Sequence, residues 1–231
     1  MIGIIGAMSI EVQLLIDRMT DVKEIKKARM VFYSGKLEGK DVAVVKCGVG
    51  KVNAAVCTQV LIDEFDTKAV INTGVAGGLL PELEAGDVVV SSELIEHDMD
   101  VTALGYRLGQ IPDMDESVFK ADKGLIDLAV KSSKEVLKDK KVLVGPIVSG
   151  DQFINSSEKV NFLKRAFNGY AVEMEGAAIA HCAYLNAVPF VIIRGISDKA
   201  DEESNISFEE FTDMAAHNSS EIVCRMLRYW E

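Results

Sequence analysis

The chain has 231 residues, of which 48% are hydrophobic and 6% aromatic, and its formal net charge at pH 7 is −11. This length fits a single domain spanning residues 1–231 with a large, mostly aliphatic core. The acidic excess argues against a nucleic-acid partner, because a phosphate backbone needs a basic face. No apolar run reaches the ~18 residues of a membrane helix, and the N-terminus lacks the basic region of a signal peptide. We therefore expect a cytoplasmic protein without a membrane partner.

Hydrophobic patterns of strand and helix type alternate along the chain. In chain order they predict strand 1–7, helix 9–19 capped by Ser9, a hairpin of 31–37 and 41–48, helix 51–65, strands 68–74 and 87–95, helix 123–138, strand 142–150, helices 157–167 and 175–187, strand 189–198 and helix 207–229. Continuous β-branched runs are typical of strands covered on both faces, so the chain is predicted to be an α/β sandwich. The irregular segment 97–118 is long for a loop, which indicates a functional segment or one held by a partner surface.

Two glycine-rich segments resemble phosphate-binding loops only in part. Around Gly48–Lys51, a Walker loop would need glycine at position 45 and Ser or Thr at position 52, and both are valine. A dinucleotide-binding fingerprint would need glycine where the chain has Asn53. We interpret this segment as a tight turn between strand and helix. The second segment, 74–78, is predicted to be a turn able to hold an anion, a sugar or nothing.

Neither the cysteines nor the histidines predict a metal site. The chain has no CxxC spacing, so its cysteines are predicted to be free buried thiols: Cys47, Cys57, Cys182 and Cys224. His97, Asp98 and Asp100 cluster in sequence, but they have no matching partner elsewhere. We interpret them as solvated loop residues, and we predict neither a metal nor a cofactor.

Charged residues interrupt apolar patterns at several positions, where burial is unfavourable unless the charge is paired. Glu11 lies on the first helix, where the helix dipole also favours a carboxylate. Glu173 and Glu175 share one side of the chain if that segment is extended. They suit a vicinal diol or the start of the following helix. Arg194 lies on the last strand and Asp198 ends it, where ligands bind in open α/β sheets, although Asp198 could equally cap a turn.

Seven motifs taken together resemble one enzyme family. They are GIIGAMSIEV (3–12), GVGKVNAA (48–55), NTGVAGGL (72–79), HDMDVTALGY (97–106), VSGDQFI (148–154), VEMEGAAIAH (172–181) and RGISDKAD (194–201). In this order and spacing the chain resembles, over almost its whole length, the 5′-methylthioadenosine/S-adenosylhomocysteine nucleosidases of the nucleoside phosphorylase family. The resemblance implies a three-layer α/β/α sandwich with a central mixed, partly closed β-sheet, adenine nucleosides as ligands, and a homodimer.

The resemblance also implies a role for each site residue. Glu11 would act as a base toward water, and Asp198, oriented by Ser197, would protonate N7 of the purine. Glu175 would hold the ribose hydroxyls, with Met174 packed against the sugar. The remaining substrate-binding residues would be Phe153 and Ile154 at the adenine, Met8, Val49 and Phe208 at the 5′-thio group, and Gly77, Glu173 and Arg194, with Val101 and Leu104 contributed by the neighbouring subunit.

The implied reaction is hydrolysis of 5′-methylthioadenosine and S-adenosylhomocysteine, and also of 5′-deoxyadenosine, in methionine salvage and methyl-cycle recycling. An acid that protonates the purine and a base that activates water need different environments. Glu11 would repel phosphate, which favours hydrolysis over a purine nucleoside phosphorylase. The same catalytic carboxylates would serve a futalosine-type nucleosidase with a larger 5′ substituent. A non-catalytic nucleoside-binding protein is a further alternative, although the presence of Glu11, Glu175 and Asp198 together argues against it. The chain departs from the family pattern at Val75, where many members have serine, and at Leu104, where phenylalanine is expected.

Overall fold

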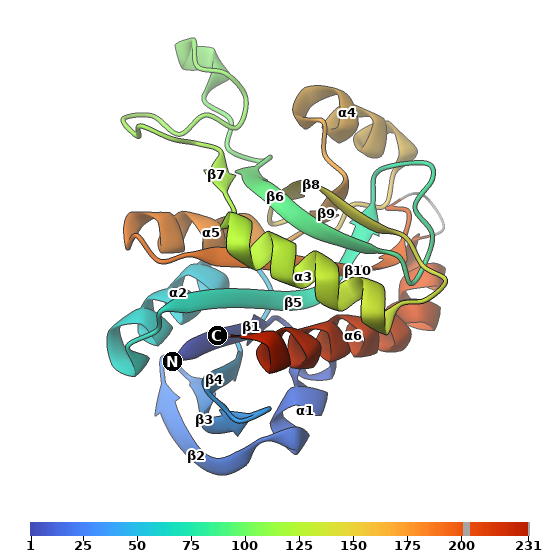
Figure 1. The fold of residues 1–231 in the computed structure, drawn as a ribbon. Coiled ribbons are helices and arrows are strands. Elements are labelled where there is room, and N and C mark those ends of the chain that lie inside the picture. Colours follow the sequence, from blue (N-terminus) through green and yellow to red (C-terminus); the bar gives the residue numbers. More distant parts are fainter. Residues whose placement is uncertain (201–203, 231) are drawn as a thin grey trace.

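The structure is a computed structural model that describes residues 1–200 and 204–230. Its strands and helices follow the predicted order, with three further strands (Figure 1). In chain order they are β1 (Ile2–Gly6), α1 (Ser9–Arg18), β2 (Thr20–Lys27), β3 (Met30–Leu37), β4 (Lys40–Lys46), α2 (Lys51–Phe65), β5 (Ala69–Gly78), β6 (Val88–Glu96), the 3₁₀ turn η1 (Thr102–Leu104), β7 (Phe119–Lys120), α3 (Lys123–Val136), β8 (Val142–Ser149), α4 (Ser157–Phe167), β9 (Ala171–Glu173), α5 (Gly176–Leu185), β10 (Phe190–Asp198) and α6 (Ser204–Tyr229). No described helix is long and apolar enough to cross a membrane.

The strands form one mixed sheet. Its order is β10-β6-β8-β9-β5-β1-β4-β3-β2, and β7 pairs with β6. Since β10 pairs with β5 as well as with β6, the strands β5, β10, β6, β8 and β9 close into a ring. β1 and β10 run parallel to β5, whereas β9 runs antiparallel to it. The predicted mixed, partly closed sheet is therefore confirmed.

Helices cover both faces of the sheet, as the three-layer prediction requires. Helices α2 and α5 pack together on one side, and α1, α3 and α6 lie on the other (Figure 1). Consecutive strand residues feed the two cores alternately, because side chains alternate along a strand. Ile4 and Ile71 belong to the core under α1, α3 and α6, while Ile5 and Val70 belong to the core under α2 and α5. Burial of both faces explains the uninterrupted apolar runs.

Strand β2 is a feature that the hydrophobic pattern does not predict. All eight of its residues are exposed, so it lacks the apolar alternation of a half-buried strand. It pairs antiparallel with β3 and forms one end of the sheet order. Its lysines, Lys23, Lys26 and Lys27, suit an edge position because charged side chains oppose edge-to-edge association.

The start of α1 and the segment 74–78 both differ from prediction. Ser9 is the first residue of α1 rather than its cap, and the N-cap is Met8. The Met8 N–H is satisfied by the Glu11 carboxylate, which reaches back from the third helical position. Residues 74–78 form no turn, because β5 continues through them to Gly78. The parallel partner β10 extends the ladder as far as Asp198, which keeps this segment in the sheet.

Candidate active site

A pocket lies where β1 and β10 end, beside the carboxyl half of β5. The wall is completed by Glu11 of α1, the segments that follow β4 and β8, the end of β9 with the two residues that lead into α5, and Phe208 of α6. Its lining residues are Ala7, Met8, Glu11, Val49, Val75, Ala76, Gly77, Gln152, Phe153, Ile154, Val172, Glu173, Met174, Glu175, Ser197, Asp198 and Phe208. Ligands of open α/β sheets bind at such strand ends, so this pocket is the candidate active site.

Glu11 is held in a fixed position by backbone groups. It is 2% exposed. Its Oε2 accepts hydrogen bonds from the N–H groups of Ala7, at 2.7 Å, and Met8, at 2.8 Å, and its Oε1 accepts one from the Val75 N–H at 3.0 Å. Burial raises the pKa of Glu11, although Arg194 and the three N–H groups act to lower it. A carboxylate with a raised pKa at a pocket wall is suited to accept a proton.

Asp198 is aimed at the pocket by an irregularity in β10. The pairing register with β5 shifts between Ile196 and Asp198, and such a bulge re-aims the side chain that follows it. The Ser197 hydroxyl donates a hydrogen bond to Asp198 Oδ2 at 2.7 Å, and the Ala200 N–H donates one to Oδ1 at 2.7 Å. A Cβ at Gly77 would lie 3.1 Å from Asp198 Oδ1 and 2.8 Å from the Ala200 Cβ. The glycine therefore allows β5 to approach this carboxylate closely.

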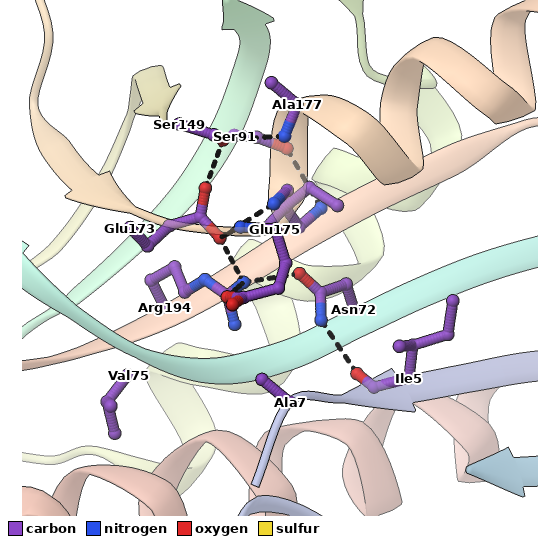
Figure 2. Close-up of polar contacts among 12 residues, drawn as sticks. Ile5, Ala7, Asn72, Val75, Ser91, Ser149, Glu173, Glu175, Ala177 and Arg194 are labelled. Carbon is purple, nitrogen blue, oxygen red and sulfur yellow. Dashed lines mark hydrogen bonds and ion pairs between the residues drawn. The ribbon is translucent and has the colours of Figure 1, made fainter. Parts of the chain in front are cut away.

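Glu173 and Glu175 both line the pocket but have different partners (Figure 2). Glu173 Oε2 accepts hydrogen bonds from the N–H groups of Glu175, at 2.9 Å, and Gly176, at 2.7 Å, and its Oε1 accepts one from the Ser149 hydroxyl. Glu173 thus satisfies the first N–H groups of α5, and the protein occupies both its oxygens. Glu175 Oε1 accepts a hydrogen bond from the Gly50 N–H at 2.9 Å. Of the two carboxylates, Glu175 keeps more acceptor capacity for a ligand.

Arg194 lies behind these carboxylates, completely buried and outside the pocket lining. Its Nη2 donates a hydrogen bond to Asn72 Oδ1 at 2.6 Å, pairs with Glu173 Oε2 at 2.5 Å, and lies 3.7 Å from Glu175 Oε2 (Figure 2). A side chain at Gly74 would collide with the guanidinium, so only glycine fits there. Arg194 is predicted among the substrate-binding residues, but it does not reach the pocket lining. Its position is that of an internal counter-ion, since a buried carboxylate needs one.

The Arg194 guanidinium is the counter-charge of three buried carboxylates, those of Glu11, Glu173 and Glu175. The pKa values of these carboxylates are shifted in different directions. Burial alone would raise the pKa of Glu173, but Arg194, the Ser149 hydroxyl and two backbone N–H groups together lower it below its ordinary value. Burial raises the pKa of Glu175 to about 7, and the charge of Glu173 adds to the rise. The pKa of Glu11 is also raised. The pocket thus holds carboxylates that differ in how readily they take a proton, as acid–base chemistry requires.

The rest of the wall is mostly apolar. Phe153 and Phe208 meet edge to face, with ring centroids 5.7 Å apart and an interplanar angle of 83°. Phe153 is 47% exposed, so much of its surface remains free for a flat ligand. Val75 is buried in a small cluster beside Met8 and Phe208. Its side chain offers no hydrogen bond to a water held by Glu11, and only its backbone N–H contacts that carboxylate.

The pocket brings together twelve of the fifteen site residues named from the sequence, and the other three lie elsewhere. Besides Arg194, the residues outside the lining are Val101 and Leu104, and Leu104 is 74% exposed. Sequence reasoning missed Ala7, Ala76, Gln152 and Val172. All four lie within the recognised motifs, so their position beside Met8, Gly77, Phe153 and Glu173 could have identified them.

His97 and Asp98 are not solvated loop residues, contrary to prediction. His97 is 3% exposed, and burial lowers its pKa. Asp98 pairs with Lys51 at 2.6 Å, whereas Asp100 is exposed and accepts hydrogen bonds from Thr102. Among the described residues, no group of three or more His, Cys, Asp or Glu side chains is placed to hold a metal ion. The prediction of free, buried thiols is confirmed for all four cysteines.

A carboxylate-rich pocket with no lysine or arginine in its described lining defines a site for a polar ligand without negative charge. The profile of the phosphorylase superfamily matches residues 1–228, and the chain belongs to this family. A 5′-methylthioadenosine/S-adenosylhomocysteine nucleosidase from Geobacillus sp. (strain WCH70) is 48% identical over 96% of this chain and 95% of its own length.

Solved structures agree with this assignment. The nucleosidase of the same description from Neisseria meningitidis, in complex with methylthio-immucillin-A, superposes with a TM-score of 0.95 at 45% identity, covering 99% of both chains. A futalosine hydrolase from Helicobacter pylori strain 26695 has a TM-score of 0.94 at 35% identity, covering 99% of this chain and 97% of its own.

Proposed function

We propose that this protein hydrolyses the N-glycosidic bond of 5′-methylthioadenosine and S-adenosylhomocysteine, and also of 5′-deoxyadenosine. The products are adenine and the 5-thioribose, or 5-deoxyribose, sugar. Such an activity serves methionine salvage and methyl-cycle recycling. The observation that carries the proposal is the placement of two carboxylates in one pocket, Glu11 against Val75 and Asp198 against Gly77. These contact points are two residues apart on β5, or roughly 7 Å, which leaves room for the sugar carbon and a water.

The two carboxylates have opposite tasks in the reaction. Asp198, oriented by the Ser197 hydroxyl, donates a proton to N7 of the purine, so that adenine leaves without negative charge. The bond between N9 and C1′ breaks, and a water oxygen bonds to C1′. Glu11 accepts the proton of that water, and its raised pKa makes it a stronger base than an exposed glutamate. Its three backbone N–H partners hold the carboxylate in place for this step.

The remaining pocket residues bind the two halves of the nucleoside. Glu175 accepts hydrogen bonds from the ribose 2′- and 3′-hydroxyls, and Met174 packs against the sugar. Phe153 stacks on the adenine ring, and Ile154 contacts its edge. Met8, Val49 and Phe208 surround the 5′-thio group with apolar surface. Glu173, in the pocket wall, and Arg194, behind it, hold Glu175 and the start of α5 in place.

Hydrolysis of these nucleosides is favoured over phosphorolysis, a futalosine substrate and simple binding. Phosphorolysis would place phosphate beside the buried Glu11 carboxylate, where no described lining residue carries a positive charge. A futalosine substrate is less favoured, because the relatives at 48% and 45% identity are described as acting on methylthioadenosine and S-adenosylhomocysteine. A binding protein would not need an acid and a base within one pocket.

We also propose that two copies of the chain form a homodimer. Large apolar side chains are exposed on α2, on α5 and in the loop that contains η1: Val52 at 74%, Leu185 at 65% and Leu104 at 74%. In the dimer, Val101 and Leu104 of one copy complete the 5′ end of the other copy's pocket. Light scattering on the purified protein tests the mass. A Leu104→Ser variant should raise the KM for methylthioadenosine severalfold if this loop completes the neighbouring site.

The first experiment is incubation of the purified protein with methylthioadenosine in phosphate-free buffer and again with phosphate, with identification of both products. We expect adenine and methylthioribose at a rate that phosphate does not change. Formation of a sugar 1-phosphate only when phosphate is present would show a phosphorylase and remove the role of Glu11. Binding without turnover would favour the binding protein.

A further inference from the structure

A second group of polar residues, three of them charged and one a histidine, lies beside the pocket but outside its lining. Lys51 is the first residue of α2, and its Nζ lies 2.6 Å from Asp98 Oδ1 and 3.0 Å from Glu96 Oε2. The other oxygen of Glu96 contacts His181 Nδ1 at 2.9 Å. We call Lys51, Glu96, Asp98 and His181 the Lys51 cluster. It joins the start of α2, the end of β6 and the middle of α5, which are distant in sequence.

One connection runs from the Lys51 cluster to the ribose end of the pocket. Gly50, the N-cap of α2, has a φ of 100°, a conformation that favours glycine. Its N–H donates to Glu175 Oε1 at 2.9 Å, and Val49 beside it lines the pocket. Lys51 follows Gly50 directly, so the ion pairs of its side chain and the N–H that contacts Glu175 belong to the same turn.

A second connection runs to the end of the pocket proposed to bind the adenine ring. Asp98 Oδ2 accepts a hydrogen bond from the Asp151 N–H at 2.9 Å. Asp151 Oδ1 in turn accepts one from the Lys51 N–H at 2.8 Å. Lys51, Asp98 and Asp151 therefore form a closed ring of contacts. The residues that follow Asp151 line the adenine end of the pocket, and they include Phe153 and Ile154.

The Lys51 cluster is sheltered enough for its ion pairs to hold a fixed geometry. The side chains of Lys51, Glu96 and Asp98 are 18%, 9% and 21% exposed, so solvent screens them less than ordinary surface pairs. None of the three lines the pocket, so their effect on a ligand must pass through the backbone of residues 49–51 and 151–154.

We propose that Lys51 is a positioning residue that couples the ribose end of the pocket to its adenine end. Its side chain holds the turn that supports Glu175 and the segment that carries Phe153 in one arrangement. The inference rests on the proposed function, since it assigns these ends to ribose and adenine. Displacement of a binding group by about 1 Å can lower turnover by ~100-fold, so a residue outside the pocket can have a large effect.

A double-mutant cycle tests the coupling. The variants are Lys51→Met, Glu175→Gln and both together, and the readouts are kcat and KM for methylthioadenosine. We expect Lys51→Met to lower kcat/KM by about 10- to 100-fold, mostly through kcat. In that background Glu175→Gln should lower kcat/KM by a much smaller factor than it does alone, because Glu175 is already misplaced. Lys51→Arg should restore most of the loss.

Lys123→Met is the matched control, because Lys123 is also the first residue of a helix and pairs with Asp127, but on the exposed surface. It should leave kcat/KM unchanged. Circular dichroism and light scattering establish that each variant keeps its fold and mass. If Lys51→Met fails to fold, Asp98→Asn breaks the same ring with a smaller change and replaces it in the cycle.

The coupling would be overturned if the double variant lost kcat/KM by the product of the two single-variant factors. It would also be overturned if Lys51→Met had the same kcat/KM as the Lys123→Met control. If the unaltered protein shows no turnover, the proposed function fails, and the cycle is read instead from dissociation constants of methylthioadenosine. Independent effects on those constants would again overturn the coupling, and absence of binding would overturn both proposals.

Discussion

The Arg194 cluster and the Lys51 cluster each place one cation among several carboxylates, but the two clusters differ in how deeply they are buried. Arg194 is fully buried and serves the three buried glutamates of the pocket wall. Lys51 is partly exposed and serves Glu96 and Asp98. Around Arg194, two of the three carboxylates have raised pKa values. Around Lys51, both carboxylates have lowered pKa values, even though burial acts to raise them.

The difference shows that burial and the supply of counter-charge together set whether the pKa of a carboxylate is raised or lowered. In the Arg194 cluster, desolvation outweighs the single positive charge for Glu11 and Glu175, so both hold protons more tightly than usual. In the Lys51 cluster, direct hydrogen bonds outweigh a weaker desolvation, so the carboxylates stay ionised and act as fixed anchors. In the proposed reaction the Arg194 cluster supplies the base and the ribose acceptor, and the Lys51 cluster holds the backbone that supports them.

The largest effect should come from removing Glu11, the proposed base of the Arg194 cluster. Glu11→Gln keeps the shape of the side chain but cannot accept a proton from water. We expect kcat for adenine release to fall by about 10²- to 10⁴-fold, with a much smaller change in KM. Glu24→Gln on the exposed strand β2 is the control and should not alter either constant. A Glu11→Gln variant with the turnover of the unaltered protein would remove Glu11 from the mechanism.

Removing the buried cation should be the next largest change. Arg194→Met leaves Glu173 buried without its counter-ion, which costs about 3–5 kcal/mol of unfolding free energy. Arg228→Met is the control, because Arg228 pairs with Glu38 at the surface and its loss should change the unfolding free energy little. Denaturant unfolding measures both variants. Equal losses would show that burial does not distinguish the two ion pairs.

Glu175→Gln should lower activity and raise stability. Because the folded-state pKa of Glu175 is raised to about 7, its ionisation destabilises the folded protein as pH rises from the unfolded value of 4.5 through 7. The glutamine variant escapes this loss and should be more stable by about 1–3 kcal/mol at pH 8, with no gain at pH 4. Its kcat/KM should fall because the ribose acceptor is weakened. Unfolding curves at the two pH values would contradict this account if the gain were absent at pH 8.

Lys51→Met should show the opposite pH dependence with a smaller effect. The pKa values of Glu96 and Asp98 are lowered in the folded state, so their stabilisation is present above the unfolded pKa values and is lost as pH falls below them. We expect a loss of about 1–2 kcal/mol at pH 7, between the values for exposed and buried pairs. The loss should shrink below about pH 4. Unfolding at pH 7 and pH 3 measures this, and a constant loss would show that the ion pairs contribute little.

Much of the fold and of the site could be predicted from the sequence, because both rest on local patterns. Continuous apolar runs predict strands buried on both faces, and β5 and β10 are such strands. The motifs also place Glu11, Glu175 and Asp198, and all three line the pocket. The sequence pattern does not predict β2, because a fully exposed edge strand shows no apolar alternation.

The supporting contacts could not be predicted, since they join residues far apart in the chain. Arg194 is placed by Asn72 and Glu173, and no local pattern shows that its guanidinium lies behind the pocket. Asp98 looks like a loop residue until the fold brings Lys51 within 2.6 Å of it. Such pairings depend on how the sheet closes, which is a property of the whole chain.

The opposite pKa shifts of the carboxylates in the Arg194 and Lys51 clusters can be tested most directly by a carboxyl-carbon NMR titration. The protein is labelled at glutamate, and Glu175→Gln is used for assignment. We expect one carboxyl group to titrate near pH 7 in the unaltered protein and to be absent from the variant, while Glu96 titrates below its ordinary value. A Glu175 signal that titrates near 4.5 would show that Arg194 neutralises the whole buried cluster, and would contradict the claim that burial sets its carboxylates apart.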